Sequence, residues 1–115
     1  MSRTKGSYSS ELNFKDDVAG VYKITNLITN QVYIGQSKNI KRRIWNERCL
    51  SYDPKSCPRL KEAIKQYGKH NFKYEILAEE DNKEKRLQLE SYYIRLFKSA
   101  IPEFGYNILK GKKGA

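Results

Sequence analysis

The chain has 115 residues, the length of one domain, and its 38% hydrophobic and 31% charged residues exclude a chain that is disordered throughout. No apolar run approaches the ~20 residues of a membrane span and the N-terminal residues lack the apolar stretch of a signal peptide, so we expect a cytoplasmic protein without a membrane partner. The 23 Lys and Arg residues outnumber the 13 Asp and Glu residues, and the resulting net charge of +10 favours a polyanion as the partner.

Two β-strands are predicted after a polar N-terminal arm of residues 1–18. The runs 20–24 and 31–35 are rich in β-branched and aromatic residues, which favours an antiparallel hairpin with its connection near residues 26–30. The length of this connection decides which side chains share a face of the hairpin.

Two helices are predicted next along the chain. Asn39 is a suitable N-cap for the first, which we expect to run to about Leu50. The second covers about residues 58–67, where apolar residues keep helical spacing, with Pro58 at its start and Gly68 as its stop.

A third strand and a long helix complete the predicted fold. Apolar residues alternate over 72–76, as they do in a strand with one buried face. The long helix starts after Asp81, a predicted N-cap, and ends near Lys98. The order ββααβα predicts a small α/β (α+β) domain with a three-stranded antiparallel sheet flanked by helices, followed by a basic tail at residues 110–115.

The long helix carries an acidic residue among its apolar ones. At 100° per residue, Glu90 falls on the same side as Tyr93 and Phe97. Because a bare carboxylate in a core is strongly unfavourable, Glu90 must be paired, protonated or bound to a cation. The residues alone leave a structural ion pair, a hydrogen bond from a tyrosine hydroxyl and a bound cation all open.

The hairpin brings two tyrosines to one face. With residues 27–30 as the loop, Tyr22 opposes Gly35 and lies diagonally from Tyr33. Since Gly35 has no side chain, we expect room beside a phenol for another group to enter. The structural alternative is that tyrosines simply suit strands.

The first helix has an arginine on its inward side. Arg43 and Glu47 share that side with the apolar Ile40 and Ile44. An inward arginine needs an anion, which can be Glu47 one turn on, Glu90, or the phosphate of a ligand.

Together these residues resemble a known nuclease family. The triplets Gly-Val-Tyr at 20–22 and Tyr-Ile-Gly at 33–35 resemble the two motifs of the GIY-YIG nuclease superfamily, with Val21 in place of the usual Ile. The resemblance covers about residues 19–109, which we expect to form one nuclease domain, and is greatest to the catalytic domains of homing-type and free-standing phage and intron endonucleases. It continues through three further positions: Arg43, Glu90 and Asn107.

The resemblance implies a divalent-metal-dependent DNA endonuclease that leaves a 5′-phosphate and a 3′-hydroxyl, in a bacterial or phage-infected cell. In this family the residue matching Glu90 binds one Mg²⁺ or Mn²⁺ per active site. Tyr22 would activate or orient the attacking water, Tyr33 would help to position water or phosphate, and Arg43 would bind the phosphate. Asn107 would brace the site from the C-terminal strand or loop.

One position departs from the family pattern. Many members have a His or a Tyr where this chain has Glu47, four residues after Arg43. Either Tyr22 alone serves as the base, or Glu47 shares that duty, or cleavage is slow, and we favour the first. Two other function classes stay open: a DNA-binding module that has kept the nuclease fold and lost cleavage, and a basic protein-interaction domain.

Double-stranded DNA is the expected partner, for a homing, free-standing or restriction-type enzyme. Because one active site cuts one strand at a time, cleavage of both strands requires a second visit or a homodimer. Phosphate contacts are expected from a basic group on and before the first helix: Lys38, Lys41, Arg42 and Arg48.

Overall fold

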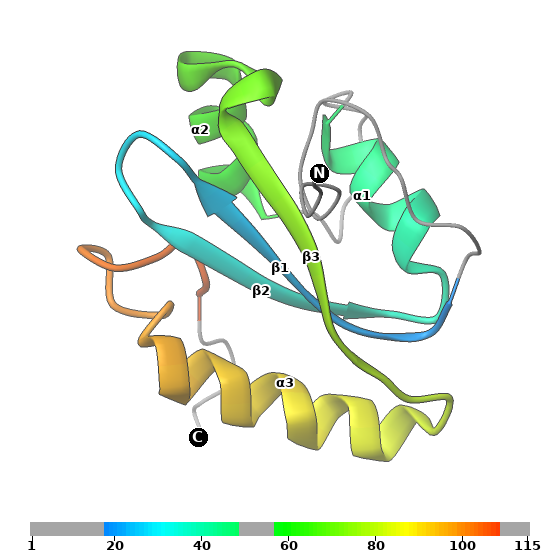
Figure 1. Ribbon diagram of the computed structural model, residues 1–115. Coiled ribbons are helices and arrows are strands. Elements are labelled where there is room, and N and C mark those ends of the chain that lie inside the picture. The colour runs from blue at the N-terminus through cyan, green and yellow to red at the C-terminus, as the bar shows by residue number, and fades with distance from the viewer. Residues whose placement is uncertain (1–17, 49–56, 109–115) are drawn as a thin grey trace, which may run out of the picture.

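The computed structural model describes the backbone of residues 18–48 and 57–108, and the side chains of these residues except 45–48. The predicted order ββααβα is confirmed, with a short 3₁₀-helix added before the third strand (Figure 1). The predicted arm, residues 1–18, lies outside the described residues except for Val18, and so does the whole of the predicted tail, residues 110–115. The elements are β1 Gly20–Asn26, β2 Val32–Ser37, α1 Ile40–Arg48, α2 Pro58–Tyr67, η1 Lys69–Asn71, β3 Phe72–Glu79 and α3 Lys83–Phe97.

The three strands form one antiparallel sheet in the order β2-β1-β3. Tyr22 pairs with Gly35 across the hairpin, which is the predicted register. The turn is fixed by Asn26, whose Oδ1 accepts hydrogen bonds from the backbone N of Ile28 at 2.9 Å and of Thr29 at 3.3 Å. Short asparagine side chains favour such local bonds, so the sequence of the turn sets the register of the strands.

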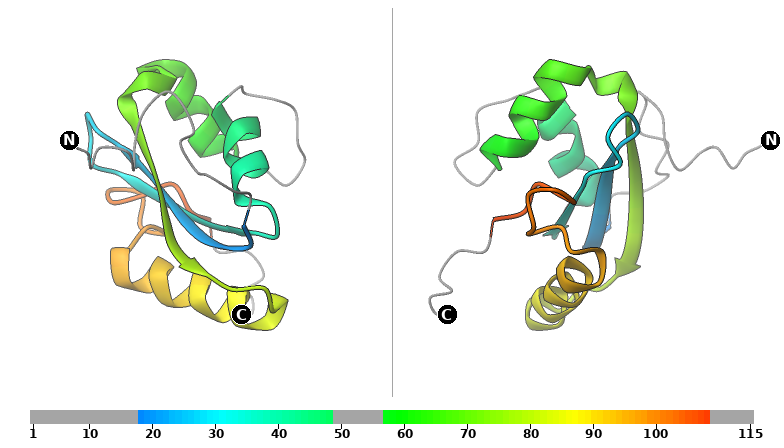
Figure 2. Two further views of the ribbon diagram at one scale, coloured as in Figure 1. Left: turned by 45° about the vertical axis from the view of Figure 1, so that its right-hand side comes forward. Right: turned by 90° about the vertical axis from the view of Figure 1, so that its left-hand side faces the viewer.

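The sheet separates two layers of helices. Helices α1 and α2 cover one face and α3 lies along the other (Figures 1 and 2). The apolar core lies between the sheet and the α1/α2 layer, and its fully buried members include Tyr22, Ile24, Ile40, Ile44, Leu60 and Phe72. The most extensive contacts of helix α3 are with β2, which is an edge strand of the sheet. The edge at β2 is therefore flanked by helices of both layers.

The ends of two helices test the capping predictions. Helix α2 begins at Pro58 and ends before Gly68 as predicted, and Gly68 has the positive φ of 88° that glycine tolerates best. The predicted cap of α3 was wrong by one residue. Asn82, not Asp81, is the N-cap, because its Oδ1 accepts a hydrogen bond from the backbone N of Lys85 at 2.9 Å.

Helix α1 begins directly after Asn39, as predicted. The backbone N of its first residue, Ile40, donates to the carbonyl of Val18 at 2.9 Å, which ties the start of α1 to the chain before β1. The predicted end of this helix, Leu50, lies outside the described residues.

A C-terminal segment, residues 104–107, covers the outer edge of β2. The backbone N of Val32 donates to the carbonyl of Phe104 at 3.0 Å, and the carbonyl of Val32 accepts from the backbone N of Tyr106 at 2.9 Å. Val32 and Gly105 form a parallel bridge. Among the described residues, no helix combines the length and apolarity needed to cross a bilayer.

Candidate active site

Glu90 on α3 is partly buried against the sheet, as its place among apolar residues predicted. Burial raises the pKa of the Glu90 carboxyl from 4.5 to about 7, and the positive charge of Arg43 on α1 acts in the opposite direction. The guanidinium of Arg43 is therefore close enough to the Glu90 carboxyl to lower its pKa, although α1 and α3 lie on opposite faces of the sheet. Such an approach is possible where the sheet ends, at the edge strand β2.

Tyr22 reaches this edge from the middle strand. A Cβ atom added to Gly35 would lie 2.5 Å from both Cζ and Oη of Tyr22, so the phenol passes directly over the glycine of β2. The room expected beside the phenol is thus filled by the phenol itself, and the prediction that Gly35 admits another group there was wrong. The glycine is required because any side chain at this position would collide with the ring of Tyr22.

Tyr33 lies beside Tyr22 on the same face of the hairpin, as predicted. Their ring centroids are 6.3 Å apart and their ring planes are tilted by 48°. Both tyrosines are buried in the core. The structure thus brings the two phenols together on the hairpin, and that they share one site with Arg43 and Glu90 stays a prediction.

Asn107 supports this edge through the backbone of β2. Its Oδ1 accepts from the N of Ile34 and its Nδ2 donates to the carbonyl of Ile34, both at 2.8 Å. The segment holding Asn107 is itself anchored by Arg59, whose guanidinium donates to the carbonyl of Gly105 at 2.9 Å. Asn107 therefore holds the backbone of Ile34, the residue between Tyr33 and Gly35, through hydrogen bonds of its side-chain amide.

Comparison with known proteins shows which family has this fold. A family model described as the GIY-YIG catalytic domain matches residues 18–107. The chain belongs to the GIY-YIG family. The catalytic domain of the homing endonuclease I-TevI superposes with a TM-score of 0.65 at 28% identity, over 80% of this chain and 99% of that one. A mutant of the same domain, described as from an intron endonuclease, gives 0.65 at 26% identity, over 79% and 93%.

A curated relative extends beyond the matched region. The protein segD of Enterobacteria phage T4, named as a candidate endonuclease, is 32% identical over 74 residues. The match covers 64% of this chain and 30% of the length of segD.

The remaining predicted residues of the GIY-YIG site lie on α1, except Lys38, which precedes the helix. Arg43 is partly buried, Lys41 is also partly buried, and Lys38 and Arg42 are exposed. The side chains of Glu47 and Arg48 lie outside the described residues, so the pairing of Arg43 with Glu47 stays a prediction. Lys41 and Arg42 thus lie on the same helix as Arg43, and Lys38 lies just before it.

Two residues beside the GIY-YIG site were missed by sequence reasoning. Arg86 on α3 is buried, with 5% of its surface exposed, and its Nε donates to Oε1 of Gln36 on β2 at 2.9 Å. The signal was available for Arg86, because it precedes Glu90 by four residues and helical periodicity turns both inward. For Gln36 the signal is its place directly after the second triplet.

The raised pKa of Glu90 predicts a pH-dependent stability of the metal-free GIY-YIG domain. Between pH 4.5 and about 7 the folded state binds more protons than the unfolded state, so stability falls as pH rises through this window. Glu90→Gln has no such group. We expect its melting temperature in EDTA to exceed that of the wild type by more at pH 8 than at pH 5, as measured by circular dichroism. An equal difference at both pH values contradicts the buried position of Glu90.

Proposed function

We propose that this GIY-YIG domain is a divalent-metal-dependent endonuclease that cleaves double-stranded DNA to leave a 5′-phosphate and a 3′-hydroxyl. One observation carries the proposal: a partly buried carboxylate, Glu90, with a pKa raised to about 7, lies within electrostatic range of Arg43. A carboxyl whose pKa is strongly perturbed by burial, with a specific charged partner, is typical of a functional site. The likeness to a homing endonuclease catalytic domain and the net charge of +10 support the choice of DNA.

The donor set suits one Mg²⁺ or Mn²⁺ ion. The described residues contain no group of three or more His, Cys, Asp or Glu side chains that could enclose a metal. Mg²⁺ needs no such group, because it keeps several waters and binds through one or two carboxylates and a substrate phosphate. Glu90 would be the protein ligand, and a cation there would compensate for the burial of its charge. When bound, the ion supplies positive charge at the scissile phosphate.

The other side chains have roles that follow from their positions. In the proposed hydrolysis, the hydroxyl part of a water joins phosphorus, the bond from phosphorus to O3′ breaks, and the water proton passes to O3′. Tyr22 and Tyr33 would orient the water and the phosphate through their hydroxyls, since their rings lie side by side. Arg43 would bind phosphate oxygens and stabilise their developing charge. Asn107 would keep the backbone of β2 in place through its two bonds to Ile34.

Homing-type, free-standing and restriction-type roles all use this reaction. Lys38, Lys41 and Arg42 would contact the DNA backbone near Arg43, and Arg48 would extend that basic group along α1. One such site cuts one strand at a time, so cleavage of both strands would require a second binding event or a second copy of the chain.

The proposal is tested by incubating the protein with supercoiled plasmid and Mg²⁺ or Mn²⁺. We expect conversion to the nicked form, its loss in EDTA, and a rate reduced about 10²–10³-fold in Arg43→Ala, the range for loss of one group that stabilises transition-state charge. DNA ligase should reseal the nick without prior kinase treatment, since it requires a 5′-phosphate and a 3′-hydroxyl. The control His70→Ala changes an exposed side chain of η1, beside the hairpin loop, and should cleave normally.

Two outcomes contradict the proposal. Nicking that is equal in wild type and Arg43→Ala would identify a contaminating nuclease. Salt-sensitive binding of DNA without nicking under any metal condition would identify a DNA-binding module with the nuclease fold.

A further inference from the structure

Arg86 is a buried charged residue that the proposed reaction does not use. Its Nη1 donates to the carbonyls of Asp81 at 2.7 Å and Glu80 at 3.3 Å, and its Nε donates to Oε1 of Gln36 at 2.9 Å. The guanidinium therefore binds both the turn that leads into α3 and a side chain of β2. A buried arginine with three neutral acceptors fixes the relative position of the elements that supply them.

Gln36 is placed by the alternation of β2. Gly35 pairs with Tyr22 and faces the α1/α2 layer, so the next residue faces α3. Two successive residues of β2 therefore have different contacts. Gly35 leaves space for the phenol of Tyr22 on the face of the α1/α2 layer, and Gln36 binds Arg86 on the face of α3. The anchor of α3 lies one residue from the glycine at the site.

Arg86 is also one helical turn before Glu90. Residues four apart in an α-helix lie above one another on the same side, so the rotation of α3 that brings Arg86 to Gln36 also turns Glu90 toward the sheet. A charge effect does not explain the arrangement, because the cation that lowers the pKa of Glu90 is Arg43.

We propose that Arg86 is a positioning residue for Glu90. The bond from Arg86 to Gln36 sets the rotation of α3 about its axis and its position along the edge strand β2. The inference deepens the proposed function and rests on it to the extent that Glu90 takes part in cleavage. Removal of the bond would let α3 shift, and a shift of about 1 Å in a catalytic group can cost 10²-fold in rate.

The test breaks the contact from the β2 side, so that α3 keeps its sequence. Gln36→Leu removes the acceptor, whereas Gln36→Glu keeps an oxygen that accepts from Arg86. We measure Mn²⁺ binding without DNA by electron paramagnetic resonance, and the single-turnover nicking rate at saturating DNA. Both assays are run well below the melting temperature of every variant.

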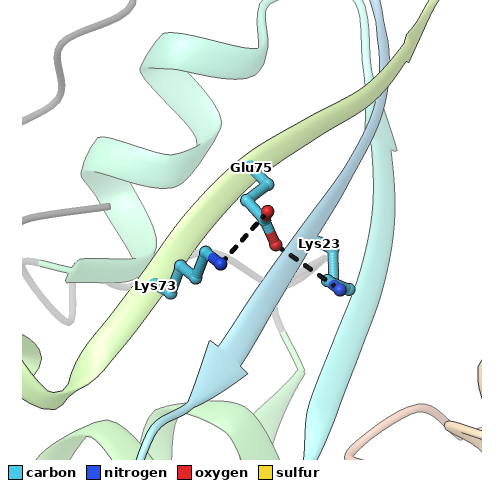
Figure 3. A network of polar contacts seen from close by, with 3 residues as sticks. All are labelled: Lys23, Lys73 and Glu75. Carbon is cyan, nitrogen blue, oxygen red and sulfur yellow. Dashed lines mark ion pairs between the residues drawn. The ribbon is translucent and has the colours of Figure 1, made fainter. Parts of the chain in front are cut away.

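A matched control removes a different contact of α3. Lys23 lies over the ring of Phe97 at the far end of this helix, 4.5 Å from its centroid, and pairs with Glu75 at 3.4 Å. Figure 3 shows that Lys73 reaches the same carboxylate, at 3.5 Å, so Lys23→Met leaves Glu75 paired. This variant should lose stability and keep both Mn²⁺ affinity and rate.

For Gln36→Leu we expect Mn²⁺ affinity and nicking rate to fall about 10–100-fold, the usual cost of losing a residue that orients a metal ligand. The affinity for DNA should be unchanged, and Gln36→Glu should behave like the wild type. Equal losses in Gln36→Leu and Lys23→Met, or no loss in Gln36→Leu, overturn the inference.

The two proposals fail separately. If the wild type binds Mn²⁺ but does not nick DNA, the proposed function fails, while weaker Mn²⁺ binding by Gln36→Leu still supports the role of Arg86. If the wild type nicks DNA and Gln36→Leu nicks it equally well, only the role of Arg86 fails. A wild type that neither binds Mn²⁺ nor nicks DNA overturns both.

Discussion

Glu90→Gln is expected to lower metal-dependent nicking by at least about 100-fold. Glutamine keeps the size of the side chain but has no negative charge to hold a divalent cation, and a catalytic metal is worth several kcal/mol of charge stabilisation in the transition state. The loss should not come from unfolding, because this variant removes a carboxyl whose pKa burial raises to about 7. Above pH 7 the metal-free variant should therefore be at least as stable as the wild type.

The measurement is the initial rate of plasmid nicking over a series of Mn²⁺ concentrations. Glu90→Asp is the matched control, because it retains a carboxylate at a shorter reach and should recover activity at higher Mn²⁺. A Glu90→Gln protein that nicks like the wild type would show that cleavage occurs elsewhere. An Asp variant as inactive as the Gln variant would show that the carboxylate must reach one fixed place.

Gly35→Ala is expected to damage the site from the opposite side. The new Cβ would lie 2.5 Å from Cζ and Oη of Tyr22, so the phenol or strand β2 must move. Overpacking of this kind costs about 1–3 kcal/mol of stability. Displacement of the hydroxyl by about 1 Å should lower the nicking rate about 10²-fold. Chemical denaturation and single-turnover nicking measure the two effects separately.

Gly68→Ala is the control for this prediction. Gly68 has a φ of 88° and open space around it, with Asn71 Nδ2 at 3.8 Å from the added Cβ, so alanine there strains the backbone without touching the site. It should be destabilised and still nick at the wild-type rate. If Gly35→Ala nicks as fast as the wild type, the position of the Tyr22 hydroxyl does not limit the reaction.

Local rules were enough for the parts of the fold that local contacts decide. The hairpin register followed from the loop length, and helix α2 followed from Pro58 and Gly68. The inward direction of Glu90 followed from helical periodicity. The cap of α3 was misplaced by one residue because Asp81 and Asn82 are both good caps, and the chain leaving β3 decides between them.

Distant contacts decided what the sequence left open. Asn107 binds the backbone of Ile34, 73 residues earlier, and no spacing rule predicts that its amide is used for strand support. The burial of Arg86 depends on Gln36, which is 50 residues away. The filling of the space at Gly35 depends on the length of the ring on the neighbouring strand, which the register alone does not give.

The segment at residues 104–107 also bears on how copies of this domain avoid one another. The edge of a sheet is a template for further strands, and an open edge promotes self-association. Here the outward backbone groups of Val32 and Ile34 are occupied by Phe104, Tyr106 and Asn107. The same short stretch that supports the edge strand β2 at the candidate site therefore protects that edge against strand addition, so mutations that loosen this stretch should favour aggregation.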